Sequence, residues 1–327
     1  MSGVQRRTVA QEEADQRLDR WFLQHFPDLP RGRLQKLLRT GQIRVDGKRA
    51  KAGLRLDPGQ EIRVPPIETK TKVATAVRPA VEETDIQFLR DRVLYIDDDM
   101  IAIDKPFGLA VQGGSRTERH LDGMLDALRY DGDERPKLVH RLDKDTSGVL
   151  LVARSVRVAE HLGKQFQRSD IRKQYWALVA GVPSPRQGEI DLPLIKAGRR
   201  GQERVLVDER NGKHATTRYA VIECAARKCS WLVLFPETGR THQLRAHLAA
   251  IGHPIIGDGK YGGEKAFLDG VDIARRMHLH ARRIEFLHPT KAHEFSVTAP
   301  LTDHMLASWE FFELDGNIAI EDPFSGK

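Results

Sequence analysis

A polar turn that leads directly into a short apolar run places the strongest limits on how this sequence can fold. The run Val149-Leu150-Leu151-Val152-Ala153 is rich in β-branched residues and is bounded by Gly148 and Arg154. Both properties predict a buried β-strand. An acid, Asp143, precedes the strand and stands between two basic residues. Burying a carboxylate is unfavourable unless it is paired. We therefore expect Asp143 either to have an arginine partner or to have a shifted pKa and be reactive.

The residues around Asp143 leave more than one role open. A turn-capping aspartate is one interpretation, because Asp, Thr, Ser and Gly are common turn formers. A phosphatase-like pair of Asp143 and Asp145 that holds magnesium is another, although the apolar strand would then be expected before the acids. A calcium loop is excluded, because its twelfth position needs a bidentate acid and this sequence has Arg154 there.

Composition favours a globular protein with a polyanionic partner. The chain has 327 residues, which is enough for two domains. Its net charge of +7 indicates a basic surface. Its two cysteines, Cys224 and Cys229, provide neither a disulfide framework nor four zinc ligands, so reduced thiols are expected. No apolar stretch reaches membrane-spanning length and no signal-peptide pattern is seen, which predicts a cytoplasmic protein.

The pattern of residues 14–65 is that of a small α+β unit. Apolar residues within 14–26 repeat at three and four residues and predict an amphipathic helix. A second, basic helix follows and ends at Gly41. Alternating residues then predict strands at 43–45 and 62–64. Helices first and strands after indicate one compact α+β module.

This module resembles the S-four RNA-binding fold. The matching residues are Arg17-Leu18-Asp19, the basic second helix, the stretch from Gly41 to Lys48 and the stretch from Leu56 to Ile62. Basic side chains on such a module would form a cationic face against phosphates, which positions a protein on RNA without reading sequence. The residues expected there are Arg31, Arg33, Lys36, Arg39, Lys48, Arg49 and Lys51. A solvated charged surface is the alternative.

The stretch His140-Arg141-Leu142-Asp143-x-x-Thr146-Ser147-Gly148 resembles the catalytic motif of the large-subunit ribosomal RNA pseudouridine synthases. The resemblance implies that Asp143 is the catalytic aspartate and that Arg141 helps to displace the target base. Further stretches are similar to other motifs of the family, in the family's order. They are 104–111, the strand from Lys173 to Gly181, 239–245, 253–262 and 280–289.

Two more site residues follow from this resemblance. Tyr175 matches the tyrosine that stacks on the target uracil, although a core aromatic is the plainer interpretation of the same residue. Arg240 lies in the turn Gly239-Arg240-Thr241-His242-Gln243. An arginine at that turn suits a charge-assisted pair with the buried Asp143 and would keep it ionised. A purely structural ion pair is the alternative for Arg240.

The whole chain is therefore expected to be an α+β protein of two domains. The resemblance implies a small N-terminal α+β RNA-binding domain and a larger synthase domain with a mixed, mostly antiparallel sheet and flanking helices. The expected bounds are a flexible tail at 1–13, the RNA-binding domain at 14–65, a linker at 66–88, the catalytic domain at 89–310 and a loosely held tail at 311–327.

The implied reaction is the isomerisation of specific uridines to pseudouridine in large-subunit (23S) ribosomal RNA. No cofactor is implied. No metal is expected either, because the strand pair His278 and His280 lacks a third ligand. The expected partner is large-subunit ribosomal RNA or an assembling ribosomal particle, with no membrane partner and a monomer as the default. Two alternatives are a specificity for other large-subunit uridines and a non-catalytic, RNA-binding assembly factor.

Overall fold

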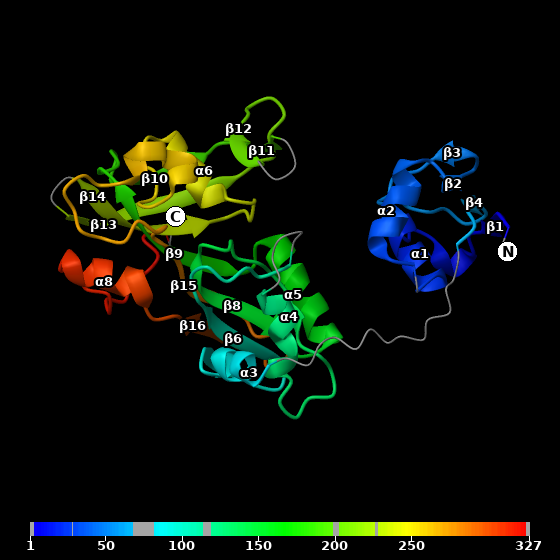
Figure 1. Ribbon diagram of the computed structural model, residues 1–327, viewed down its shortest axis with the longest axis horizontal. Coiled ribbons are helices and arrows are strands. Elements are labelled where there is room, and N and C mark those ends of the chain that lie inside the picture. Colours follow the sequence, from blue (N-terminus) through cyan, green and yellow to red (C-terminus); the bar gives the residue numbers. More distant parts are fainter. Residues whose placement is uncertain are drawn as a thin grey trace. The chain divides into compact units, whose positions relative to one another are not determined.

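The computed structural model describes residues 3–27, 29–67, 82–113, 119–198, 203–225 and 228–324. The chain divides into two compact units, Met1–Pro79 and Ala80–Lys327. Figure 1 shows the elements of the first unit in blue and those of the second from cyan to red. Most of the expected linker at 66–88 lies outside the described residues, which resume at residue 82.

The first unit is the expected small α+β domain. Its elements are β1 (Gln5–Thr8), the 3₁₀ helix η1 (Gln11–Glu13), α1 (Leu18–His25), α2 (Arg31–Arg39), β2 (Arg44–Val45), β3 (Lys48–Arg49) and β4 (Glu61–Val64). The strands pair antiparallel in the order β1-β4-β2-β3. One apolar core joins the two helices to the sheet, with Trp21 from α1, Leu34 from α2 and Ile62 from β4 all buried. Burial of these side chains is the main force that holds the unit together.

The start of the first unit differs from the prediction. Residues 5–8 lie in the stretch expected to be a flexible tail, yet they form β1, which pairs with β4 and is the edge strand of the sheet. All four side chains of β1 are exposed, so no apolar pattern marks the strand in the sequence. The strand forms because its backbone N–H and C=O groups pair with those of β4, which would otherwise be an unpaired sheet edge. The first helix begins at Leu18, four residues later than expected, because Asp15 adopts a left-handed backbone with φ of 59°.

The second unit is built on a large mixed sheet. The strands of that sheet are β5 (Val93–Ile96), β6 (Met100–Lys105), β7 (Lys137–Leu138), β8 (Ser147–Ala153), β9 (Arg172–Ala180), β10 (Gln187–Asp191), β13 (Thr216–Ala225), β14 (Cys229–Pro236), β15 (Leu279–Leu287) and β16 (Glu294–Thr298). Strands β11 (Leu194–Ala197) and β12 (Arg204–Val207) pair with each other in a separate sheet. The main order is β10-β13-β14-β9-β15-β8-β6-β5, with β16 on β15 and β7 on β8. Strands β8 and β15 run parallel, and the other described pairs are antiparallel. The predicted fold class is thus confirmed.

Helices pack against both faces of this sheet. The helices are α3 (Glu83–Arg90), α4 (Leu121–Met124), α5 (Val156–Arg168), α6 (Gln243–Ala250), α7 (Gly259–Gly262) and α8 (Asp303–Phe311), with the 3₁₀ helices η2 (Leu125–Leu128) and η3 (Gly263–Ala266). Leu150 and Val152 of β8 pack in a cluster with α3 and α4, whereas Val149 and Leu151 pack in another with α5. Because successive strand residues point to opposite faces, a strand buried on both sides needs an unbroken apolar run. The predicted strand at 149–153 is confirmed and forms the last five residues of β8.

Two stretches expected to be loose are ordered in the second unit. Helix α3 occupies the end of the expected linker, because Leu89 is buried with Ile86 and Phe88 beside it. The expected C-terminal tail also packs, as Phe312, Leu314, Ile320 and Phe324 lie against a cluster of buried tryptophans. Their apolar side chains are spaced too irregularly for a helix or strand pattern. Residues 325–327 lie outside the described residues.

Within the described part of the chain, every helix falls short of the length and apolar character that a bilayer crossing requires.

Candidate active site

A cavity of about 310 Å³ in the second unit brings together all four residues predicted to be catalytic. Arg141 and Asp143 come from the turn before β8, Tyr175 from β9, and Arg240 from the loop that leads into α6. The lining has four arginine and lysine side chains, those of Arg141, Lys173, Arg240 and Arg245, and a single carboxylate, that of Asp143. Such a cavity suits an anionic ligand of nucleotide size.

The turn that carries Asp143 is held from below by a buried lysine. Lys105, at the end of β6, is fully buried, and its ammonium donates to the carbonyl oxygens of Pro106 (2.8 Å), Leu109 (2.9 Å) and Lys144 (3.1 Å). Burial lowers the pKa of Lys105 to about 7, opposed by the charges of nearby aspartates, Asp143 among them. In the sequence, the sign of this contact is that Lys105 is a charged residue at the end of a mostly apolar strand.

Gly148 lets the turn lie close to a neighbouring strand. Its φ of 104° is in the left-handed region that favours glycine. A Cβ at this position would overlap the carbonyl oxygen of Ala281 on β15. This is where β8 and β15 meet in their short parallel pairing, Ser147 with His280 and Gly148 with Ala281. The glycine therefore fixes the register that brings the Asp143 turn to the centre of the sheet.

The carboxylate of Asp143 accepts no hydrogen bond from the residues that the structure describes. Its side chain is 20% exposed, and its Oδ2 lies 3.7 Å from His242 Nε2 and 3.8 Å from Arg245 Nη1. Both nitrogens are close enough for electrostatic attraction and too far for a hydrogen bond. The charge of Asp143 is thus stabilised by its neighbours, while its oxygen atoms remain available to react.

The expected ion pair between Asp143 and Arg240 is wrong, because Arg245 takes that position. Arg240 lines the same cavity, but its Nε donates to the backbone oxygen of His214 at 3.0 Å and its side chain is exposed. Arg245 lies one turn into α6, three residues after His242, and that spacing puts both residues on one side of the helix end. The motif itself contained both residues, and their helical spacing was the signal that could have identified them.

Arg245 is itself held by a buried carboxylate. Its Nε and Nη2 donate to the two oxygens of Asp258, each at 2.7 Å. Burial opposes the charged form of Arg245, but the bonds to Asp258 and the charges of Asp258 and Asp143 outweigh it and raise the pKa. The guanidinium is therefore a permanent cation beside Asp143.

Tyr175 and Lys173 lie on the same side of β9 and both line the cavity. Burial, and then the charge of Asp143, raise the pKa of Tyr175, so that its hydroxyl stays protonated. Burial alone lowers the pKa of Lys173, and no described residue pairs with its ammonium. A half-buried cation without a described partner is unfavourable, which makes Lys173 a further candidate site residue.

His140 of the motif has a structural contact in the cavity wall. Its Nε2 accepts a hydrogen bond from the backbone N–H of Leu151 at 2.8 Å, and its ring stacks on Phe166 with a centroid distance of 4.5 Å. Burial, and then the charge of Lys173, lower its pKa to about 3. A neutral His140 thus ties the motif to β8.

The predicted RNA-binding residues lie in the first unit. The side chain of Arg31 lies outside what the structure describes. Six others are exposed and take part in no described ion pair, namely Arg33, Lys36, Arg39, Lys48, Arg49 and, just after β3, Lys51. The first five come from α2 and from β3. Cations without partners on a small domain are suited to contacts with phosphates.

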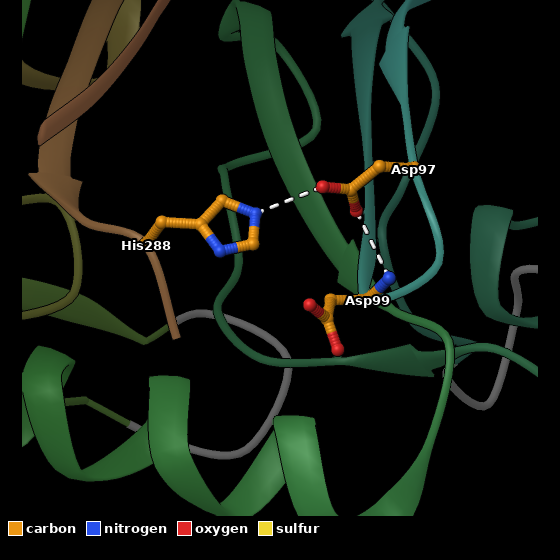
Figure 2. A group of neighbouring side chains, drawn as sticks. All are labelled: Asp97, Asp99 and His288. Carbon is orange, nitrogen blue, oxygen red and sulfur yellow. Dashed lines mark hydrogen bonds and ion pairs between the residues drawn. The ribbon is translucent and has the colours of Figure 1, made fainter. Parts of the chain in front are cut away.

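A second cluster, Asp97, Asp99 and His288, has the composition of a metal site (Figure 2). Its oxygens are already engaged by hydrogen-bond donors. Asp97 Oδ2 accepts from His288 Nε2 (2.8 Å), Lys291 Nζ (2.7 Å) and Tyr95 Oη (2.9 Å). Its Oδ1 accepts from the backbone N–H groups of Asp99 and Met100, both at 2.9 Å. The cluster joins the β5–β6 turn to the end of β15, which is a structural role.

Comparisons with known proteins agree with the fold and the motifs. Residues 99–250 match the RNA pseudouridylate synthase family, and residues 16–62 match the S4 domain. Ribosomal large subunit pseudouridine synthase C of Vibrio cholerae is 35% identical over 304 residues, which cover 91% of this chain and 93% of the relative. The synthase C of Escherichia coli K12 is 34% identical over 302 residues, or 90% of this chain and 92% of the relative.

A solved structure shows the same fold. Human RNA pseudouridylate synthase domain containing 4 superposes with a TM-score of 0.58 at 25% identity, and the match covers 70% of this chain and 96% of the human chain. With the sequence matches and the arrangement around Asp143, this shows that the chain belongs to the RNA pseudouridylate synthase family, whose members are isomerases, and carries an N-terminal S4 domain.

Proposed function

We propose that this enzyme converts specific uridines of large-subunit ribosomal RNA to pseudouridine, with Asp143 as its catalytic residue. The observation that carries the proposal is the Asp143 carboxylate, which accepts no hydrogen bond from any described residue and lies in a cavity lined by Arg141 and Tyr175. The RNA class follows from the names of the relatives, which are large-subunit synthases. The basic cavity and the S4 domain support a polyanionic substrate.

The reaction needs the target base outside the RNA stack. Extruding one nucleotide requires a few kcal/mol. Arg141 is exposed at the cavity and has no described hydrogen-bond partner, so its side chain is free to enter the space that the base leaves. The Tyr175 ring provides an aromatic surface on which the uracil can stack, which stabilises a base by roughly 1–3 kcal/mol. Lys173 and Arg240 then offer cationic groups to the neighbouring phosphates.

The chemistry itself conserves all atoms. The bond between uracil N1 and ribose C1′ breaks, the base rotates, and a bond forms between uracil C5 and C1′. The hydrogen on C5 leaves as a proton, and N1 gains one. Asp143 acts on the ribose, either as a nucleophile or as a base that removes a proton. Arg245 balances the charge of Asp143 from 3.8 Å, and His242 Nε2 faces the same oxygen at 3.7 Å.

The proposed setting is the bacterial cytoplasm, where the substrate is free ribosomal RNA or an assembling particle. A specificity like that of the synthase C relatives is proposed, with other large-subunit uridines as the alternative. Arg33, Lys36 and Arg39 of α2, together with Lys48 and Arg49 of β3, would contact RNA phosphates through the S4 domain.

The proposal is tested by tritium release. The enzyme is incubated with large-subunit RNA, small-subunit RNA and transfer RNA, each carrying tritium at uridine C5, in the presence of a chelator. Isomerisation replaces the C5 hydrogen, so we expect tritium in water from large-subunit RNA alone, at positions that mapping then identifies. Release from transfer RNA or small-subunit RNA only would contradict the proposed substrate. No release from any RNA or from assembling particles would contradict the proposed function.

A further inference from the structure

A short turn outside the cavity lining contacts both side chains that face Asp143, those of Arg245 and His242. This turn comprises Gly257, Asp258 and helix α7, and it is called here the α7 turn. Its first contact is with Arg245. Asp258 has a side chain that is 1% exposed, and it binds Arg245 Nε and Nη2 at 2.7 Å each. A guanidinium is planar and rigid, so fixing two of its nitrogens fixes the third. That third nitrogen, Nη1, is the one 3.8 Å from Asp143.

The position of Asp258 is in turn fixed by the backbone. Its Oδ1 accepts from the backbone N–H of Tyr261 at 3.3 Å and caps α7. Gly257 before it has φ of 79°, and a Cβ there would overlap the carbonyl oxygen of Arg276. The chain on either side of Asp258 therefore has little freedom to move.

The second contact of the α7 turn is with His242. The hydroxyl of Tyr261 lies 3.0 Å from the backbone nitrogen of Val205 and 2.8 Å from His242 Nδ1. A backbone N–H can only donate, so the hydroxyl oxygen accepts from Val205. Among the described residues the hydroxyl has no other acceptor for its proton, so the proton is directed to His242, whose Nδ1 accepts it. The proton of the neutral ring is left on Nε2, the atom 3.7 Å from Asp143 Oδ2.

The remaining surroundings agree with a single ring proton on His242. Burial is the main influence that lowers the pKa of His242, and the charges of Arg245 and Lys260 act in the same direction. The charges of Asp143 and Asp258 oppose them without reversing the shift. The ring is thus neutral, and its tautomer is set by Tyr261. The same tyrosine ring also lies under Arg245, with Cζ 4.9 Å from its centroid.

We infer that Asp258 and Tyr261 are positioning residues for the isomerisation, because they aim Arg245 Nη1 and His242 Nε2–H at the reactive carboxylate. The inference rests on the proposed function of Asp143. Neither Asp258 nor Tyr261 is expected to touch the RNA, yet both should affect the rate of the chemical step. Loss of either should lower kcat and leave KM unchanged.

The tautomer is tested first, by NMR of the histidine ring nitrogens in the full chain. The His242 signals are assigned by their loss in His242→Gln. In the unmodified protein we expect an unprotonated Nδ1 and a protonated Nε2. In Tyr261→Phe, which keeps the ring under Arg245, we expect a mixture of tautomers. A protonated Nδ1 in the unmodified protein, or an unchanged spectrum in Tyr261→Phe, would overturn the inference.

Turnover is tested on the same proteins. We expect Tyr261→Phe to lower kcat about fivefold, the effect of one neutral hydrogen bond, and Asp258→Asn to lower it about tenfold, the effect of a charged one. The matched control is Tyr219→Phe, which removes a hydroxyl that donates to the Pro185 backbone oxygen and belongs to a side chain outside the cavity lining. Its kcat should be unchanged. Equal losses in Tyr261→Phe and Tyr219→Phe would mean a structural role only.

Two further readouts keep the outcomes separate. Thermal unfolding shows whether Asp258→Asn folds, and if it does not, Tyr261→Phe decides the matter alone. If the unmodified enzyme releases no tritium from any RNA, the proposed function fails, whereas the NMR result still decides whether Tyr261 sets the His242 tautomer.

Discussion

Two aspartates of the second unit have similar neighbours and very different surroundings. Asp143 and Asp97 each lie in a turn next to a strand of the large sheet, and each has a histidine and a basic side chain beside it. The side chain of Asp143 is 20% exposed and that of Asp97 is 11% exposed. Residue types and burial alone would not separate a reactive carboxylate from a structural one.

Hydrogen bonds make the difference. Asp97 accepts five of them, from three side chains and two backbone amides, all within 2.9 Å. Asp143 accepts none from the described residues, and its two cationic or polar neighbours stay at 3.7 and 3.8 Å. A carboxylate whose lone pairs are all engaged is stabilised and unreactive. The carboxylate left without bonds, inside a cavity, is the one available for chemistry.

Among the neighbours of the two aspartates, the largest effect is expected at Arg245. Arg245→Met removes the permanent charge beside Asp143, so kcat should fall about 100-fold, somewhat less than the roughly 4 kcal/mol between two unit charges about 4 Å apart near a protein surface. The variant also leaves Asp258 buried without a partner. The double variant Arg245→Met with Asp258→Asn removes that penalty and serves as the control. A normal kcat in the folded double variant would show that the charge of Arg245 is not needed.

The next effect is expected at Asp97, and on stability instead of turnover. Asp97→Asn places an amide where Lys291 and His288 donate, so the free energy of unfolding should fall by about 2 kcal/mol. Urea unfolding measures this change, and tritium release per folded molecule should stay the same. A selective loss of turnover would give Asp97 a catalytic role and remove the contrast with Asp143.

A smaller effect should appear in the dependence of stability on pH. Burial opposes the charged form of Asp97, but the hydrogen bonds from Lys291 and from the backbone outweigh it and hold the pKa well below the ordinary value. The unfolded chain therefore binds the proton more tightly than the folded one. The stabilisation is complete above the ordinary pKa of about 4 and is lost as the pH falls towards the folded pKa. Asp97→Asn should have a flatter acid limb, and an identical slope in both proteins would contradict this origin.

The smallest effect is expected at Lys173, where substitution should weaken activity and raise thermal stability. Its ammonium lines the cavity without a partner among the described residues. Lys173→Met should raise KM about tenfold by removing one charged contact to RNA, and it should raise the melting temperature because a half-buried charge without a described partner is lost. Steady-state kinetics and thermal unfolding measure the two changes. A lower melting temperature with unchanged KM would mean that Lys173 is structural.

The sequence was sufficient for features that depend on local pattern. The apolar run at 149–153 identified β8, and the spacing in residues 14–26 identified α1. The motif around Asp143 and the strand with Tyr175 placed two residues that the structure brings into one cavity. These predictions needed only periodicity and a motif of adjacent residues.

Other features depend on contacts between distant segments, which no local pattern contains. Arg240 and Arg245 lie in one motif, and only the start of α6 decides which of them reaches Asp143. The bond from Tyr261 to His242 depends on the packing of the α7 turn against α6. Strand β1 is exposed on all its side chains and exists because β4 offers an unpaired edge. The expected domain bounds missed this strand for the same reason.

The central claim, that Asp143 is the reactive carboxylate, is tested most directly by Asp143→Asn. The substitution keeps the size of the side chain and removes its charge, and no hydrogen bond to its carboxylate is lost among the described residues. Tritium release from C5 of large-subunit RNA should become undetectable, while RNA binding and the unfolding midpoint stay close to those of the unmodified enzyme. Substantial release by the folded variant would contradict the account and rule Asp143 out as the catalytic residue.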